Sequence, residues 1–197
     1  RQLELREDLV QDLFIELEKL LTGISLVKEL TPRTLDYVAS FGELASANII
    51  AEYLNKVGIP SKAVSAWEIG LFTDSEWTKA NPLPGNESVI REELSKIKPL
   101  PIVTGFIGKN RKGEITTLGR NGSDLTATLL GTAIMATEVQ IWRSIPGVMT
   151  ADPRLVENAK PIFDLSFDEA AELAYYGSKI LHPSALVPAI KKNIPVR

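Results

Sequence analysis

Cysteine is absent from this chain of 197 residues, and His182 is its single histidine. Without cysteine there is neither a disulfide framework nor a thiolate nucleophile, and one histidine excludes a metal site built from several. No stretch approaches about 18 consecutive apolar residues, so no membrane-spanning helix is predicted. The formal net charge of −3 lacks the basic excess of a nucleic-acid-binding surface. We therefore expect no nucleic-acid partner and no membrane partner.

The motifs of several common enzyme classes are also missing. The chain has no GxxxxGK[ST] sequence, hence no P-loop, and it has neither the HRD nor the DFG sequence of protein kinases. The Gly-x-Ser-x-Gly turn of serine hydrolases does not occur either. Hydrophobic residues make up 44% of the chain and charged residues 24%, which is ordinary for a globular protein.

The segment TTLGRNGSDLTATLL, residues 116–130, carries the strongest local signal. Its two glycines allow positive φ and the close approach of another backbone. Ser123 and Asp124 stand before a run of helix-forming residues, a pattern typical of a helix N-cap. A helix N-terminus entered from such a turn can bind an anion, and Arg120 can form paired hydrogen bonds with a carboxylate or phosphate. The simpler alternative is an ordinary capped turn with a surface arginine.

Two helices are predicted before residue 60. Leucines at helical spacing predict the first over residues 9–21, ending near Gly23, and a core-facing helix is preferred over a partner-binding one. Thr31-Pro32 predicts the start of the second, which ends at Gly58 and is interrupted near Ser40. Its apolar positions are Leu35, Val38, Phe41, Ala45, Ile49 and Tyr53.

Strands and helices alternate after residue 60. Strands are predicted over residues 61–73, 101–108, 114–118, 138–142 and 194–197, and helices over residues 87–98, 125–136, 167–176 and 183–191. Such alternation predicts βαβ units, hence an α/β fold with a mostly parallel sheet and helices on both faces. No linker clearly divides the chain, so we expect one domain over residues 1–197.

Polar residues follow three of the predicted strands, and ligands of open α/β sheets bind beyond the carboxyl ends of strands. The three groups are Thr104-Gly105-Phe106, the turn at residues 119–124 and the loop at residues 143–154. Cations at this edge would offset phosphate charge; the candidates are Arg120, Arg154 and Lys179.

Four stretches, in order along the chain, resemble the aspartate kinases of the amino acid kinase family. They are ELTPRTLDYVASFGELAS, GFIGKNRKGEITTLGRNGSDLTATLL, GVMTADPRLV and SFDEAAELAYYGSKILHPSALVPA. The resemblance covers nearly the whole chain and is far more specific than one glycine-rich turn. It implies a three-layer α/β/α sandwich with a largely parallel central sheet.

The resemblance implies transfer of a phosphoryl group from ATP to the side-chain carboxylate of L-aspartate. The product would be β-aspartyl phosphate, the first intermediate toward lysine, threonine and methionine. Arg120 would hold the α-carboxylate of aspartate, and Glu43 and Asp124 would hold its ammonium group. Phe106 would line the aspartate pocket, and Ser123 would lie where aspartate and ATP meet. Arg120 and Asp124 are the implied catalytic residues, because the substrate's own carboxylate is the nucleophile.

The resemblance also implies a nucleotide site, with Mg²⁺ carried by the ATP. Its implied residues are Ser123, Arg143, Ser144, Met149, Arg154, Lys179 and Ile180. The family usually has Trp-Thr-Asp-Val where this chain has Trp142-Arg143-Ser144-Ile145, and often tyrosine at position 149. The family's N-terminal Lys-Phe-Gly-Gly strand and C-terminal ACT domains have no counterpart here. We therefore expect a catalytic domain that is incomplete at both ends and is not fully active alone.

Two other functions stay open on the sequence alone. One is a different amino acid kinase, acting on glutamate, acetylglutamate or a nucleotide. The other is a non-catalytic member that binds aspartate but binds ATP poorly, which Arg143-Ser144 and the missing lysine suggest. The resemblance further implies a homo-oligomer in the full-length protein, located in the cytoplasm, or in the plastid if the source is a plant.

Overall fold

The computed structural model of the protein describes residues 3, 5–6, 8–143, 147–152, 155–175 and 183–197. The chain forms two compact units, residues 1–123 and residues 124–197. The boundary falls within the first turn of helix α4, Gly122–Ala133. No helix in the described part of the chain is long and apolar enough to cross a bilayer.

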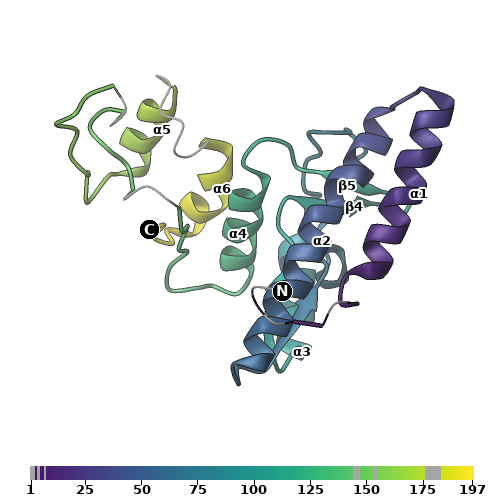
Figure 1. Ribbon diagram of the computed structural model, residues 1–197. Coiled ribbons are helices and arrows are strands. Elements are labelled where there is room, and N and C mark those ends of the chain that lie inside the picture. The colour runs from purple at the N-terminus through teal and green to yellow at the C-terminus, as the bar shows by residue number, and fades with distance from the viewer. Residues whose placement is uncertain (1–2, 4, 7, 144–146, 153–154, 176–182) are drawn as a thin grey trace. The chain divides into compact units, whose positions relative to one another are not determined.

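The first unit begins with an antiparallel pair of helices, α1 (Gln11–Val27) and α2 (Pro32–Lys56) (Figure 1). The predicted start of α2 is confirmed, because the Thr31 side chain accepts a hydrogen bond from the Thr34 backbone and Pro32 opens the first turn. The helix runs through Ser40 without the expected interruption. The predicted end of α1 at Gly23 is wrong, since the helix continues four residues further; an internal glycine weakens a helix by only about 1 kcal/mol.

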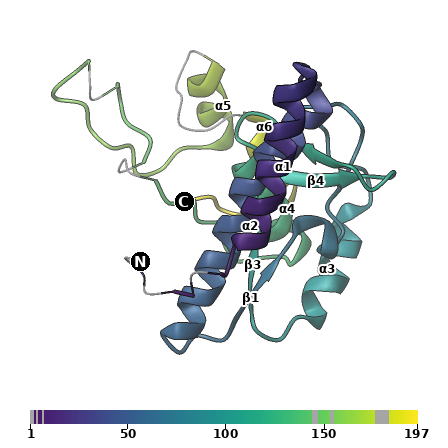
Figure 2. The ribbon, with the colours of Figure 1, turned by 45° about the vertical axis from the view of Figure 1, so that its right-hand side comes forward.

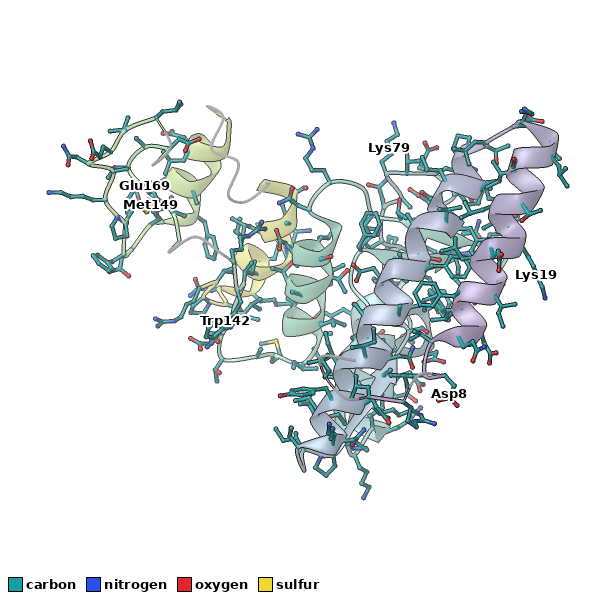
Figure 3. All side chains as sticks on the ribbon, in the orientation of Figure 1. Asp8, Lys19, Lys79, Trp142, Met149 and Glu169 are labelled. Carbon is teal, nitrogen blue, oxygen red and sulfur yellow. The ribbon has the colours of Figure 1, made fainter. Side chains whose placement is uncertain are left out.

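Helix α1 packs against α2 but has no buried residue. The prediction of a core-facing helix is therefore wrong. Phe14 and Leu26 are 59% and 79% exposed, because one neighbouring helix cannot cover both sides of a wide apolar stripe. Lys19 points away from α2 (Figure 3).

Five short strands follow in the first unit. β1 (Ser61–Val64) pairs in parallel with β3 (Leu100–Val103), and β2 (Phe72–Thr73) pairs in parallel with β4 (Ile107–Asn110). β4 then pairs antiparallel with β5 (Ile115–Thr117), which confirms the predicted return strand. Parallel and mixed sheets with flanking helices are the arrangement of an α/β fold, as predicted.

A short 3₁₀ helix, η1 (Ala66–Ile69), separates β1 from β2, so the predicted stretch over residues 61–73 is two strands. Helix α2 packs against β1, β3 and β5, and helix α3 (Asn86–Lys96) packs against η1. In Figure 2, β1 and β3 lie between α2 and α3. The core residues of this unit gather on η1, the chain beside it and α3: Val64, Ala66, Ile69, Leu71, Ile90 and Ile107.

The buried face of α2 agrees only in part with the predicted apolar one, since Phe41 is buried as predicted. Leu35 and Tyr53, taken from the sequence as core positions, are 45% and 40% exposed. The buried residues are small or polar, apart from one phenylalanine: Asp36, Ser40, Phe41, Ala47 and Ala51. Small and polar side chains let the backbones of strands and loops come close to the helix and bond to it. This face therefore positions loops as well as filling a core.

The second unit contains most of α4, with α5 (Phe167–Tyr175) and α6 (Pro183–Lys192). The Thr128 hydroxyl of α4 donates to the Ala185 carbonyl of α6, 2.6 Å away. A small core is formed by Ala189 of α6 with two residues outside the helices, Val139 and Ile194.

The strands predicted over residues 138–142 and 194–197 are reduced to one parallel bridge between Val139 and Val196. Trp142, at the end of the first of these segments, is 88% exposed and projects from the backbone (Figure 3). The Trp142 side chain is therefore not part of the small core of this unit.

Candidate active site

Two loops of the first unit meet at the carboxyl ends of their strands. One contains Gly105 and Phe106, between β3 and β4, and the other leads from β5 into α4. The Leu118 N–H donates to the Phe106 carbonyl, 2.8 Å away. A Cβ added to Gly105 would lie 3.0 Å from Ser123 Oγ, and a Cβ added to Gly122 would lie 2.8 Å from the Phe106 ring. The predicted close approach at the glycines is thus confirmed.

Both loops hold backbone in the left-handed region. Phe106 has φ 65°, a conformation that a bulky L-residue rarely adopts, and Asn121 has φ 59°, which asparagine adopts more readily. Gly119 also has a positive φ, of 72°, as the sequence predicts for this turn. Strained backbone of this kind costs about 1–3 kcal/mol per residue and clusters at ligand sites. The strain marks these two loops as a candidate site, independently of any motif.

Glu43 reaches one of these loops from α2. Its Oε2 accepts a hydrogen bond from the Gly105 N–H, 3.2 Å away, and the side chain is half-buried. Burial raises the pKa of Glu43, and the Gly105 hydrogen bond opposes that shift by stabilising the carboxylate. A cation placed beside Glu43 would favour the ionised form further. The carboxylate is therefore suited to holding an ammonium group.

Arg120 lies on the other loop and Ser123 follows in the first turn of α4, and both are exposed. Within the described residues, no carboxylate forms an ion pair with the Arg120 guanidinium. Helix α4 begins at Gly122, three residues before the expected start, so Ser123 and Asp124 lie in its first turn and not in front of it. The N-cap prediction is wrong for that reason. The exposed Arg120 side chain can accept a carboxylate, while the Ser123 hydroxyl lies against Gly105, whose N–H holds Glu43.

Asp124 belongs to the second unit and forms an ion pair with Arg143 of the same unit. The Asp124 side chain is 12% exposed and that of Arg143 35%. Partial burial makes such a pair stronger than a fully exposed one. Two residues predicted to contact two different ligands, aspartate and nucleotide, are thus paired with each other.

The remaining nucleotide candidates are mostly outside the described residues. Met149 is half-buried and forms an isolated antiparallel bridge with Pro161. Four of the predicted positions lie beyond the described residues: Ser144, Arg154, Lys179 and Ile180. In the part of the chain that the structure describes, no group of three or more acidic or histidine side chains could hold a metal ion by itself.

Sequence reasoning missed Asp36, the most buried carboxylate near the site. The residue is 1% exposed and accepts hydrogen bonds from Thr78 and Thr117. A sequence signal was available, because Asp36 and Glu43 are seven residues apart and therefore share a helix face. A second carboxylate on the helix face that carries Glu43 was the available sign of polar contacts there.

A half-buried carboxylate on α2 and an exposed guanidinium on the loop between β5 and α4 thus stand at two loops that meet in an α/β fold. The chain belongs to the amino acid kinase family, because the sequence pattern of the "Amino acid kinase family" matches residues 3–197. The resemblance found in the motifs is thereby confirmed.

Within this family, the chain is similar in sequence to named aspartokinases. "Aspartokinase 3, chloroplastic" of Arabidopsis thaliana is 47% identical over 186 residues, which are 92% of this chain and 33% of the relative. "Lysine-sensitive aspartokinase 3" of Escherichia coli is 38% identical over 193 residues, covering 92% of this chain and 42% of the relative. This chain therefore spans between a third and about two fifths of the length of these relatives.

Solved structures agree with the sequence comparison. The structure of E. coli aspartokinase III in complex with aspartate and ADP has a TM-score of 0.82 and 35% identity to this chain. The match covers 98% of this chain and 44% of that one. Uridylate kinase of Archaeoglobus fulgidus, at 19% identity and a TM-score of 0.51, shares the fold alone. The amino acid kinase fold predicted from the motifs is confirmed.

Proposed function

We propose that this chain is the aspartate-binding and catalytic part of an enzyme that phosphorylates the side-chain carboxylate of L-aspartate with ATP. The observation that carries the proposal is the Glu43 carboxylate bound to the Gly105 amide, with Ser123 against Gly105 and Arg120 in the turn just before Ser123. The similarity to aspartokinases, one of them in complex with aspartate and ADP, supports the choice of ligands.

In this proposal Arg120 binds the α-carboxylate and Glu43 binds the ammonium, with Asp124 as its second anionic partner. Phe106 borders the bound aspartate, and Ser123 lies between aspartate and the nucleotide. The β-carboxylate of aspartate attacks the γ-phosphorus, its new P–O bond replacing the bond to ADP. The residues act by placing and orienting the attacking group, which is most of what phosphoryl transfer requires of a protein.

The donor set of the described residues fits an anionic nucleotide, since the exposed Ser123 hydroxyl stands in the first turn of α4. When bound, ATP with Mg²⁺ would supply the phosphoryl group and the charge that neutralises it. Arg143 and Met149 would hold the nucleotide, together with the four predicted positions beyond the described residues: Ser144, Arg154, Lys179 and Ile180.

An acceptor assay tests the proposal directly. The protein, in its full-length form, is incubated with ATP-Mg²⁺ and each of aspartate, glutamate and acetylglutamate, and the acyl phosphate is trapped with hydroxylamine. We expect product with aspartate alone. Preferential phosphorylation of glutamate or acetylglutamate would reassign the substrate. Tight aspartate binding with no nucleotide binding in calorimetry would reassign the protein as a non-catalytic aspartate-binding member.

The proposal extends to assembly and location. The full-length protein is expected to be a homo-oligomer in the cytoplasm, or in the plastid if its source is a plant, as the "chloroplastic" relatives of Arabidopsis thaliana are named. Sedimentation of the full-length protein measures the first expectation, and a fluorescent fusion measures the second.

A further inference from the structure

Asp36 in α2 is a buried carboxylate that bonds to two separate segments. It is 1% exposed. The Thr78 N–H donates to both of its oxygens, at 3.1 and 2.9 Å. The Thr117 N–H donates to Oδ2 at 3.0 Å, and the Thr117 hydroxyl donates to Oδ1 at 2.7 Å. Among the described residues no cationic side chain pairs with Asp36, so neutral donors alone satisfy it.

The two segments held by Asp36 lie against each other. The Ala80 N–H donates to the Thr117 carbonyl, 2.8 Å away. A Cβ added to Gly119 would stand 2.9 Å from the Thr78 carbonyl oxygen and 3.3 Å from Lys79 Cα. The contact is through backbone, since the Lys79 side chain is exposed and points away from the loop (Figure 3). The turn that ends at Arg120 therefore packs directly against residues 78–80.

Burying a carboxyl group is costly unless it is hydrogen-bonded, and Asp36 accepts four hydrogen bonds from two segments. The neighbouring Ser40, on the same face of α2, bonds only to the Tyr37 carbonyl of its own helix. Asp36 instead bonds outside the helix, as Glu43 does seven residues later when it accepts from Gly105. Two carboxylates on one face of α2 thus hold the two parts of the candidate site. Glu43 binds the loop at Gly105, and Asp36 binds Thr117, just before the turn that carries Arg120.

We propose that Asp36 is a positioning residue for aspartate binding: it clamps residues 78 and 117 together and so fixes the turn from which Arg120 reaches the substrate. The inference rests on the proposed function for its substrate, while the clamp itself is a property of the fold. A carboxylate suits this place because both of its oxygens accept, and two of the three groups facing Asp36 are backbone N–H groups that can only donate. An asparagine would turn its own N–H₂ group toward one of them.

The test compares Asp36→Asn with Asn110→Asp. Asn110 is a matched control, because it is 2% exposed and its Oδ1 likewise accepts two backbone N–H bonds, from Lys112 and Glu114 at 3.0 Å, in the β4–β5 turn. Calorimetry measures the Kd values for aspartate and for ATP-Mg²⁺, and hydrogen exchange measures protection of residues 78 and 117–119. We expect Asp36→Asn to weaken aspartate binding about 10- to 100-fold, to leave ATP binding unchanged and to speed exchange at these amides.

Asn110→Asp, although it destabilises the fold, is expected to change neither Kd. A folded Asp36→Asn protein with wild-type aspartate affinity and wild-type exchange at residues 117–119 would overturn the inference. If Asp36→Asn does not fold, Thr117→Val removes one donor alone, and unchanged exchange and affinity in that variant would overturn it equally. If the wild-type protein itself does not bind aspartate, the proposed function fails, and the exchange measurement still decides whether the clamp exists.

Discussion

At Glu43, folding and the proposed ligand favour opposite protonation states. Burial raises its pKa above the ordinary value of 4.5, so folding favours the neutral acid while the proposed ammonium ligand favours the carboxylate. A raised folded-state pKa means that the folded state binds more protons than the unfolded state in the window above 4.5. The contribution of Glu43 to stability is then fully present below that window and is lost as pH rises through the folded-state pKa.

We expect Glu43→Gln to be at least as stable as the wild type at pH 7 and to lose aspartate binding. Urea unfolding at a series of pH values from 4 to 8, with Glu18→Gln as an exposed-carboxylate control, measures the first effect. The stability difference should shift in favour of the glutamine variant as pH rises. A variant that loses more stability at pH 7 than at pH 4.5 would contradict the assignment of the shift to burial.

Arg120 is exposed and, within the described residues, free of a carboxylate partner, so its removal should affect binding more than folding. We expect Arg120→Ala to weaken aspartate binding by about 2–4 kcal/mol, the cost of losing one partner of a charge pair. Arg111→Ala, in the exposed β4–β5 turn, is the matched control and should bind normally. Calorimetry with aspartate measures both. Unchanged affinity in Arg120→Ala would remove this arginine from the site.

Arg143 competes with a substrate ammonium for the Asp124 carboxylate if the proposed roles hold. We expect Arg143→Gln to strengthen aspartate binding by up to about fivefold, since ion pairs of limited burial contribute roughly 0.2–1 kcal/mol. Nucleotide affinity, measured in the same calorimeter, should fall. Weaker aspartate binding in this variant would mean that Arg143 orients Asp124 for the substrate and does not compete with it.

At the scale of elements, the turn between β5 and α4 requires glycine at position 119, because of both the backbone conformation and the lack of space. Gly119 combines φ 72° with a neighbouring carbonyl 2.9 Å from where a Cβ would stand, whereas Gly113, with φ 79°, has open space around it. Gly113→Ala should cost about 1–2 kcal/mol from the left-handed conformation alone. Gly119→Ala should cost about 1–3 kcal/mol more, because the backbone of residues 78–79 must also move.

Thermal or urea unfolding of the two glycine variants measures this difference. Equal destabilisation would show that the approach of residues 78–79 to the turn is not tight. Aspartate affinity should fall in Gly119→Ala and stay unchanged in Gly113→Ala, since only the former displaces the backbone that carries Arg120.

For the whole molecule, a ligand that binds the folded state raises its stability, by about 2.7 kcal/mol at 100 times Kd. We expect aspartate to shift the unfolding of residues 1–123 directly, because Glu43, Arg120 and Ser123 all belong to that unit. Trp67 and Trp77 lie in it, so the fluorescence of a Trp142→Phe variant reports this unit alone. Succinate lacks the ammonium group and should stabilise less. No fluorescence shift with aspartate would place the binding residues elsewhere.

The order of elements and the glycine positions were predictable because they follow from local chemistry. Thr31-Pro32 starts α2 through a hydroxyl cap and a fixed φ, and Gly119 and Gly122 make close backbone approaches that any Cβ would block. The family followed from the same kind of local signal, in the motifs around Glu43 and Arg120. Which segment approaches each glycine depends on the fold, since Gly119 meets residues 78–79.

Long-range contacts decided what the sequence left open or predicted wrongly. Hydrophobicity placed Leu35 and Tyr53 in the core, whereas the face of α2 that meets the sheet is the one carrying Asp36 and Ser40. A buried carboxylate is stable only where donors from other segments reach it, and Thr78 and Thr117 are 42 and 81 residues away along the chain. The sequence by itself therefore determined the kind of protein and the residues available to bind a zwitterion. The tertiary structure alone decided which carboxylates face the loops of the site, because only folding brings the opposing donors within hydrogen-bond distance.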